Sequence, residues 1–214
     1  MDDLHRGFLI YRKNIYPLHK ASLEHLAEEG QRPTTLMIGC SDSRVMIAES
    51  LQTRPGRLFI VRNAGNIVPH WGRYIGGVTA SIEFAVTALP IREIIVCGHS
   101  GCGAIDAMLY PEKVESMPAV QRWLSFASDA PLRARKLDPN ATGAGLQELV
   151  ARENVLLQLD HLRTFPCVEE HTRDRDLKLY GWYFAPDRGE LWEYVDAEQT
   201  WRTIPDIVER QSKA

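Results

Sequence analysis

Short apolar runs that alternate with helical patterns constrain this chain of 214 residues more than any other feature of its sequence. Residues 34–39, 58–62 and 93–97 each resemble a short buried strand, and the second lies between the turn signals Pro55-Gly56 and Asn63-Ala-Gly65. The segments predicted to be helical are residues 74–89, 103–109, 118–126 and 146–163. This alternation predicts an α/β fold with a mainly parallel central sheet flanked by helices.

A hairpin signal predicts the last strands of the sheet. Residues 177–184 and 190–195 flank Pro186-Asp-Arg-Gly189, which favours a turn between antiparallel strands. We therefore expect about four parallel strands and one antiparallel strand at the edge of the sheet. Residues 131–145 show the weakest pattern and are interpreted as a surface excursion.

Residues 1–30 are predicted to form an N-terminal helical arm, and residues 31–214 the main domain. Apolar residues recur along the arm at helical spacing, which predicts two helices around Pro17 and an end at Gly30. The apolar positions are Leu4, Phe8, Leu9, Leu18, Leu23 and Leu26. The arm packs either on another subunit or on its own domain, and the sequence leaves both open.

Composition narrows the setting in which the chain works. With 44% hydrophobic and 25% charged residues, it suits one globular domain with a sizeable core. A net charge of −3 gives no electrostatic case for a nucleic-acid partner, and no apolar run approaches the roughly 18 residues of a membrane span. The sequence shows no secretory signal, and four cysteines do not make a disulfide framework, so we expect a cytoplasmic protein.

Three potential metal ligands follow two of the predicted strands. Cys40 comes after the first strand, and His99 and Cys102 come after the third. Because ligands bind beyond the carboxyl ends of parallel strands, both segments deliver side chains to the same edge of the sheet. Two thiolates and an imidazole suit Zn²⁺, and three protein ligands leave the fourth position open, as in catalytic zinc sites. A disulfide between Cys40 and Cys102 is the main alternative.

Charged and small residues surround these ligands. Asp42 and Arg44 follow Cys40 at alternate positions, which predicts an ion pair beside the metal. Gly98, Gly101 and Gly103 flank the other two ligands, and we expect them to let the backbone fold tightly around an ion.

The motifs Cys40-Ser-Asp-Ser-Arg44 and His99-Ser-Gly-Cys-Gly103 together resemble the paired zinc motif of the β-class carbonic anhydrases. The resemblance covers roughly residues 30–195, because it extends to Phe59-Ile-Val-Arg-Asn-Ala-Gly-Asn66, Gly76-Gly-Val-Thr-Ala-Ser-Ile-Glu-Phe84 and Leu179-Tyr-Gly-Trp182. It implies one Zn²⁺ per subunit, held by Cys40, His99 and Cys102. It also implies the reversible hydration of CO₂ to bicarbonate and a proton by a zinc-bound hydroxide.

The same resemblance implies roles for further residues. Asp42 accepts a hydrogen bond from the zinc-bound water, and Arg44 keeps Asp42 ionised and off the metal. The positions that match the family's substrate pocket are Gln31, Phe59, Ala64, Phe84 and Gly103. Met37 stands where one branch of the family has a tryptophan that marks an inhibitory bicarbonate site, so we expect the open, plant-like type of site. His70 is either a proton shuttle or a surface histidine.

Two other functions remain open at this point. The same zinc site on the same fold serves some relatives that hydrolyse carbonyl sulfide or carbon disulfide, which resemble CO₂ in shape. A zinc-bound scaffold or redox-sensing protein without turnover is the second alternative, and Asp42, Arg44 and Gln31 argue against it. The resemblance implies a homodimer or a higher homo-oligomer, and it leaves open whether the protein belongs to a bacterial microcompartment.

Overall fold

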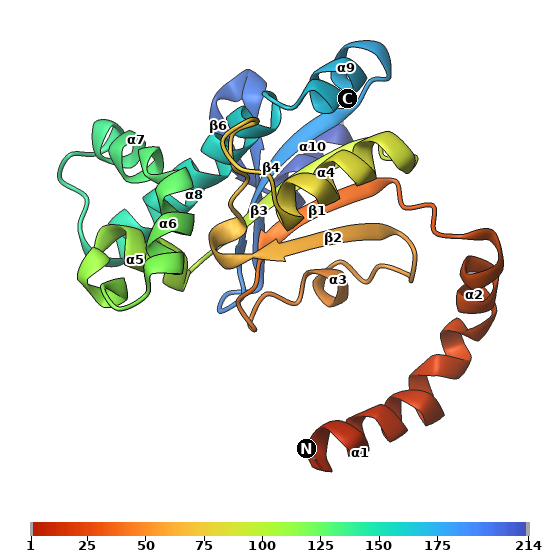
Figure 1. Ribbon diagram of the computed structural model, residues 1–214. Coiled ribbons are helices and arrows are strands. Elements are labelled where there is room, and N and C mark those ends of the chain that lie inside the picture. The colour runs from red at the N-terminus through yellow and green to blue at the C-terminus, as the bar shows by residue number, and fades with distance from the viewer. Residues whose placement is uncertain (1, 213–214) are drawn as a thin grey trace.

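The computed structural model describes residues 2–212, and a six-stranded sheet forms its centre, in the order β2-β1-β3-β4-β5-β6 (Figure 1). The parallel strands are β1 (Thr35–Cys40), β2 (Leu58–Asn63), β3 (Glu93–His99) and β4 (Lys178–Ala185). Strand β5 (Glu190–Val195) pairs antiparallel with β4, and β6 (Thr200–Thr203) pairs antiparallel with β5. The predicted α/β fold is confirmed, and β6 extends the predicted edge by one strand.

The central strands are apolar because helices cover both of their faces. All six residues of β1 are buried, and Leu36 and Ile38 have no exposed surface. Parallel strands buried on both faces have this continuous apolar pattern rather than an alternating one. The pattern explains why β1 and β3 could be found from the sequence alone.

The helices agree in part with the predicted segments. The helices after β1 are α3 (Ile47–Ser50), α4 (Gly77–Ala88), α5 (Gly103–Leu109), α6 (Pro118–Leu124), α7 (Asp129–Leu137), α8 (Gly143–Leu162), α9 (Pro166–Asp174) and α10 (Ile204–Gln211). Helix α4 begins three residues later than predicted, because Gly76 has an extended backbone with φ −167°. Helices α3, α9 and α10 were not predicted.

The interpretation of residues 131–145 as a surface excursion was wrong at both ends, because residues 131–137 belong to α7 and residues 143–145 to α8. Pro131 is the third residue of α7, and proline is tolerated in the first turn, where its missing N–H has no partner to lose. Ala130 and Ala134 lie one turn apart and are fully buried. Small buried residues at this spacing carry a weak apolar signal, which explains the error.

Helix α8 packs closely across β3 and β4, and two glycines make this approach possible. A Cβ atom on Gly98 would lie 2.8 Å from Cγ2 of Val155 and 3.3 Å from the carbonyl oxygen of Ala151. A Cβ atom on Gly181 would lie 3.0 Å from Cγ1 of Val155. The requirement for glycine at position 98 is therefore helix packing, one residue before the predicted ligand His99.

Replacing Gly98 by alanine is expected to lower the free energy of unfolding by roughly 1–3 kcal/mol, because the added methyl group overpacks the contact with α8. Gly39→Ala is the matched control: Gly39 also precedes a predicted ligand on a central strand, but its Cβ would meet nothing within 4 Å. Denaturant unfolding of both variants checks this prediction. Equal destabilisation of the two would contradict it.

The N-terminal arm consists of α1 (Asp2–Ile10), a π-helical turn (Tyr11–Ile15) and α2 (Tyr16–Glu29), and it extends away from the sheet (Figure 1). No residue of these elements is buried, and the apolar side chains of Leu4, Phe8 and Leu9 are 61–73% exposed. Gly30 ends α2 with φ +81°, as predicted. The arm therefore presents an apolar surface that its own chain does not cover. Within residues 2–212, no helix is long and apolar enough to cross a membrane.

Candidate metal centre

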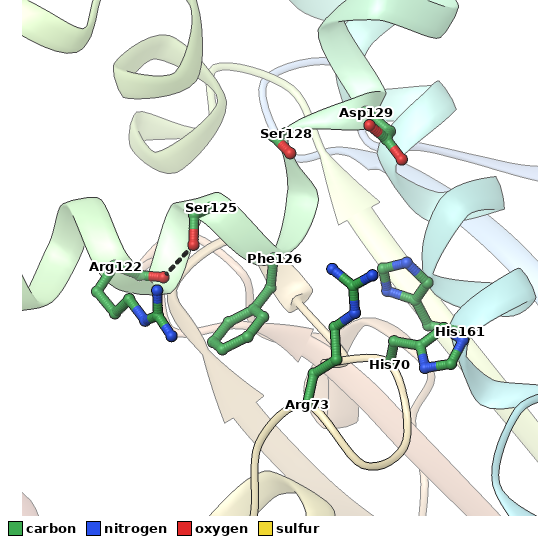
Figure 2. A pocket seen from close by; sticks show the side chains of 8 residues that line it. All are labelled: His70, Arg73, Arg122, Ser125, Phe126, Ser128, Asp129 and His161. Carbon is green, nitrogen blue, oxygen red and sulfur yellow. Dashed lines mark hydrogen bonds between the residues drawn. The ribbon is translucent and has the colours of Figure 1, made fainter.

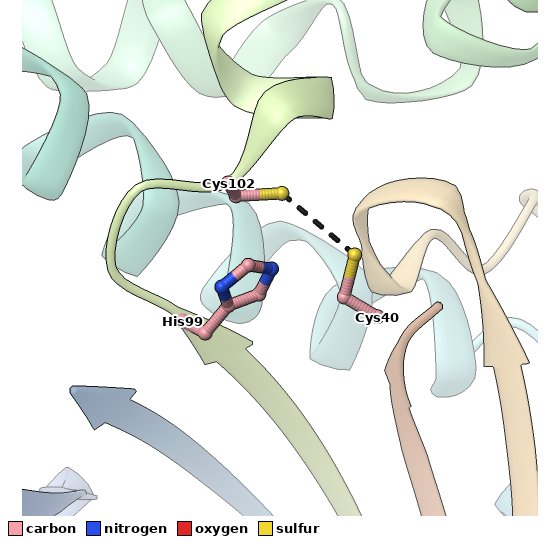
Figure 3. A group of neighbouring side chains, drawn as sticks. All are labelled: Cys40, His99 and Cys102. Atoms are coloured by element: carbon pink, nitrogen blue, oxygen red, sulfur yellow. Dashed lines mark hydrogen bonds between the residues drawn. The ribbon is translucent and has the colours of Figure 1, made fainter. Parts of the chain in front are cut away.

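Cys40, His99 and Cys102 come together at the carboxyl ends of β1 and β3. Their ligand atoms all lie within 4.8 Å of one another, and all three residues are buried. Figure 3 shows the three side chains converging from the end of β1, the end of β3 and the start of α5. The two sulfur atoms are 3.9 Å apart, within hydrogen-bond distance but not joined in a disulfide, and all four cysteines are free. The alternative of a disulfide is therefore not formed.

The donor set fits Zn²⁺. Nδ1 of His99 lies 2.9 Å from the carbonyl oxygen of Ser100, and because a carbonyl can only accept, Nδ1 carries the hydrogen. Nε2 is then the free donor atom, and it is buried without a hydrogen-bond partner. A histidine oriented in this way through its other ring nitrogen is typical of metal ligands. Two sulfurs and one nitrogen make a Cys₂His set, and tetrahedral zinc would place two sulfurs about 3.8 Å apart.

The surroundings of Cys40 favour its thiolate. The hydrogen bond with Cys102 lowers the pKa of Cys40 to about 4, against the opposing effect of burial. The same contact and burial raise the pKa of Cys102, so the pair shares one proton, which resides on Cys102. The backbone N–H of Gly65 also donates to the Cys40 sulfur, at 3.4 Å. Asn154 fixes this donor, because its side-chain amide donates to the carbonyl oxygen of Gly65 at 2.9 Å.

Asp42 and Arg44 form a two-point ion pair beside the ligands. Nε and Nη2 of Arg44 donate to the two carboxylate oxygens of Asp42 at 2.9 and 2.7 Å, and the backbone N–H of Arg44 adds a third bond at 3.0 Å. These hydrogen bonds hold the pKa of Asp42 well below its usual range. Nη2 of Arg44 also donates to the carbonyl oxygen of Gly101 at 2.8 Å, which ties the pair to the loop that carries Cys102.

Sequence reasoning missed Arg62, which fixes the backbone around Cys40. Its Nε donates to the carbonyl oxygen of Cys40 at 2.9 Å, and its Nη2 donates to that of Asp42 at 2.7 Å. The signal was a cation inside the apolar run of β2, two residues before Ala64.

Residues of β4 and of the β4–β5 turn hold the loop from His99 to Gly103 in place. Ser100 donates its hydroxyl hydrogen to Asp187 in the β4–β5 turn at 2.7 Å, and its backbone N–H bonds the carbonyl oxygen of Phe184 at 3.0 Å. Gly101 has φ +63°, so glycine is required there for its backbone, whereas a Cβ on Gly103 would meet nothing within 4 Å. Of the three flanking glycines, only Gly101 is therefore required by the backbone conformation of the ligand loop, whereas the sequence predicted this requirement for all three.

The predicted pocket residues divide into two groups. Ala64 follows β2, and Gly103 begins α5 directly after Cys102, so both lie at the ligand end of the sheet. Phe59 pairs in register with Leu36, four positions or about 13 Å before Cys40 along the sheet. Phe84, at 50% exposure, lies beside Phe59, with 6.2 Å between ring centroids.

Gln31, like Phe59 and Phe84, lies far from the metal ligands of its own chain. It precedes β1 at the opposite end from Cys40 and is exposed. Within one chain, Ala64 and Gly103 therefore lie near the metal ligands, whereas Gln31, Phe59 and Phe84 lie far from them. His70 lies outside the ligand group and lines a cavity that contains none of the metal ligands.

A buried group of two cysteines and one histidine at the carboxyl edge of a parallel sheet is the donor set of catalytic zinc enzymes. Residues 35–191 match the protein family described as carbonic anhydrase. A carbonic anhydrase of Pseudomonas aeruginosa is 40% identical over 89% of this chain and 86% of its own length.

Two solved structures agree with this match. The β-carbonic anhydrase CcaA is 36% identical, has a TM-score of 0.91, and is matched over 95% of this chain and 91% of its own. A tetrameric β-carbonic anhydrase of Sordaria macrospora is 29% identical, with a TM-score of 0.76 over 90% and 97% of the two chains. The chain belongs to the β-carbonic anhydrase family. Its cofactor is zinc, and reversible hydration of CO₂ is its expected reaction.

Proposed function

We propose that this chain hydrates CO₂ at an open zinc site held by Cys40, His99 and Cys102, with Asp42 and Arg44 as its polar machinery. The observation that carries the proposal is the buried group of three ligand atoms within 4.8 Å, next to a two-point Asp–Arg pair. Zinc, when bound, acidifies water and so supplies hydroxide near neutral pH.

Asp42 has one acceptor position left for orienting a water or hydroxyl group. A carboxylate offers about four lone-pair positions. Oδ1 accepts from the backbone N–H and Nε of Arg44, and Oδ2 accepts from Nη2. The remaining lone pair belongs to Oδ2. Because Asp42 is ionised, it can only accept there, and a hydroxyl group bonded to it turns its own lone pair away towards the substrate carbon.

Arg44 keeps the site open in this proposal. A carboxylate engaged at both oxygens would not be free to turn onto a metal held by the three ligands. Met37 is fully buried within β1, at the position where the other branch of the family has tryptophan. Both features support the plant-like type of site.

We further propose that the functional unit is a homodimer or a larger homo-oligomer, in which the arm of residues 1–30 packs on a second copy of the domain of residues 31–214. The uncovered apolar face of the arm supports this, as does the tetrameric relative from Sordaria. Gln31, Phe59 and Phe84 are partly or largely exposed and distant from their own metal centre. In an oligomer these residues would complete the substrate pocket of a neighbouring copy.

Replacing Leu4, Phe8 and Leu9 together by serine is expected to shift the protein to a smaller oligomer, because each loses apolar surface that the second copy would cover. Leu132→Ser with Leu137→Ser is the matched control, since these α7 side chains are similarly exposed, at 61 and 64%. Light scattering coupled to size-exclusion chromatography measures the mass. An unchanged mass of the arm variant would contradict the assembly.

The substrate is tested by offering the zinc-loaded protein CO₂ and carbonyl sulfide in parallel. Hydration of CO₂ is followed by stopped flow, and hydrolysis of carbonyl sulfide by sulfide release. We expect the kcat/KM for CO₂ to be the larger by orders of magnitude. The reverse order would make the protein a hydrolase of CO₂-like substrates, and turnover of neither would favour a non-catalytic zinc protein.

A reducing compartment such as the cytoplasm fits this function. The sulfurs of Cys40 and Cys102 lie 3.9 Å apart, so an oxidant that joined them would remove two of the three metal ligands. Retention of the thiols is therefore a condition for activity in this proposal.

A further inference from the structure

A second cavity, of about 470 Å³, lies between the loop after β2 and the helices α6 to α8. Its lining includes His70 and Arg73 from the loop, Arg122 and Phe126 from the α6 region, Asp129 from α7 and His161 from α8 (Figure 2). None of the metal ligands lines it, and neither Asp42 nor Arg44 does. It is therefore separate from the metal centre.

Hydrogen bonds fix the wall formed by the loop. The backbone N–H of Val68 donates to Gln158 at 2.8 Å, and Nδ1 of His161 donates to the carbonyl oxygen of Val68 at 2.7 Å. The backbone N–H of Trp71 donates to the hydroxyl of Thr164 at 3.0 Å. These three bonds tie the loop to α8 and its carboxyl end, so His70 and Arg73 project from a rigid frame.

Aromatic packing fixes the opposite wall. Nε1 of Trp123 donates to the carbonyl oxygen of Ala64 at 2.8 Å. The ring of Phe126 lies 5.9 Å from the ring of Trp123 and 5.6 Å from the ring of Tyr74. The cavity is thus preformed between two fixed walls, as small-molecule sites usually are.

The charged groups of the cavity favour an anion. Arg73 and Arg122 form no ion pair with any residue of the described part of the chain, whereas Arg133 and Arg163 nearby both pair with Asp160, at 2.8 and 3.0 Å. Asp129 is the single carboxylate among the lining residues. Guanidinium groups without a carboxylate partner are suited to bind phosphate or carboxylate oxygens.

The two histidines offer additional polar atoms. Nδ1 of His70 lies 2.8 Å from the carbonyl oxygen of Trp71, and Nδ1 of His161 is bonded to Val68 in the same way. Both Nδ1 atoms therefore carry hydrogen, and both Nε2 atoms remain available. Their rings lie 5.9 Å apart, and Figure 2 shows the Arg73 guanidinium beside them and Arg122 across the Phe126 ring. A neutral imidazole accepts from a ligand hydroxyl, and a protonated one donates to a ligand oxygen.

We propose that this cavity binds a small phosphate ester that also carries hydroxyl groups, with its phosphate on Arg73 and its hydroxyls on His70 and His161. Arg122 adds a second positive charge from across the Phe126 ring. The volume exceeds that of a phosphate ion alone and suits a ligand the size of a sugar phosphate. A phosphate ester and free inorganic phosphate share the phosphate group, so both are offered in the test.

Calorimetric titration of the full-length, zinc-loaded protein tests the proposal, with glucose 6-phosphate as the probe and with inorganic phosphate and glucose in parallel. We expect saturable binding of glucose 6-phosphate and none of glucose. Arg73→Gln is expected to weaken binding by about tenfold or more, which is the usual loss for a charge-assisted hydrogen bond, and Arg122→Gln by less. Neither arginine belongs to the metal centre, so this pattern locates the ligand in the cavity.

Arg135→Gln is the matched control, because Arg135 is an exposed arginine of α7 outside the cavity and forms no ion pair within residues 2–212. Binding to this variant should be unchanged. Inorganic phosphate that binds as tightly as the ester, with the same dependence on Arg73, would support the site with free phosphate as its ligand. No saturable binding of either phosphate compound, or an equal loss in Arg135→Gln, would overturn the proposal.

Discussion

Replacing Cys40 by serine is expected to strip zinc from the protein and to abolish CO₂ hydration. Cys40 provides one of three ligand atoms, and its thiolate is the one that the surroundings stabilise, through Cys102 and the backbone N–H of Gly65. A serine hydroxyl at this position is neither ionised nor soft, so zinc would be left with two protein ligands. Zinc per chain, by atomic absorption, and the hydration rate, by stopped flow, measure the two effects.

Cys97→Ala is the matched control for this variant. Cys97 is also a buried cysteine near the end of a central strand, but it lies outside the ligand group, and burial raises its pKa to about 12. Its replacement should leave both zinc content and activity in place. A Cys40→Ser protein that keeps a full complement of zinc and hydrates CO₂ normally would contradict the assigned ligand set.

Replacing Arg44 by glutamine is expected to reduce kcat/KM by about 10- to 100-fold while zinc is retained, the usual effect of removing a partner that orients the groups around a metal. Asp42 would lose two of its three hydrogen bonds to Arg44, and its pKa would rise towards the ordinary value. Because that ordinary value is ~4, Asp42 stays ionised at neutral pH. The expected loss therefore does not come from protonation of Asp42. It comes from a carboxylate that is free to turn onto the metal, so the loss should be largest near pH 7 and smaller at alkaline pH.

Arg173→Gln is the matched control, because it removes a two-point arginine–aspartate pair that lies outside the metal centre. Arg173 contacts Asp174 in the same two-point way, with Nε at 2.7 Å and Nη2 at 3.0 Å, on α9 away from the metal centre. Exposed pairs of this kind contribute little to stability, so activity should be unchanged. Equal activity of the wild type and the Arg44→Gln variant would show that Asp42 needs no partner.

The sequence was sufficient to predict the elements that place the ligands. Strands β1 and β3 are continuous apolar runs, and the rule that parallel strands deliver ligands at their carboxyl ends was enough to bring Cys40 to His99 and Cys102. Helix α7 was missed because Pro131 in a first turn resembles a break. Strand β6 has four residues, too few for a clear period of two.

The surroundings of the site could be predicted less well, for physical reasons. Arg62 acts through backbone carbonyls, and any residue type supplies those, so no motif marks its partners. The positions of Gln31, Phe59 and Phe84 became apparent only from the register of the sheet, which places them away from the ligands of their own chain. In the proposed oligomer their function depends on a second copy, and the sequence of one chain does not specify how copies pack.

The most direct test of this account is stopped-flow CO₂ hydration by the zinc-loaded protein, scanned from about pH 6.5 to about pH 9. We predict rapid hydration already near pH 7, because Arg44 holds Asp42 off the metal and leaves the fourth position open. Hydration that appears only at the alkaline end would contradict the open site, since it would mean that Asp42 turns onto the metal at neutral pH. No hydration at any pH, with zinc bound, would contradict the account as a whole.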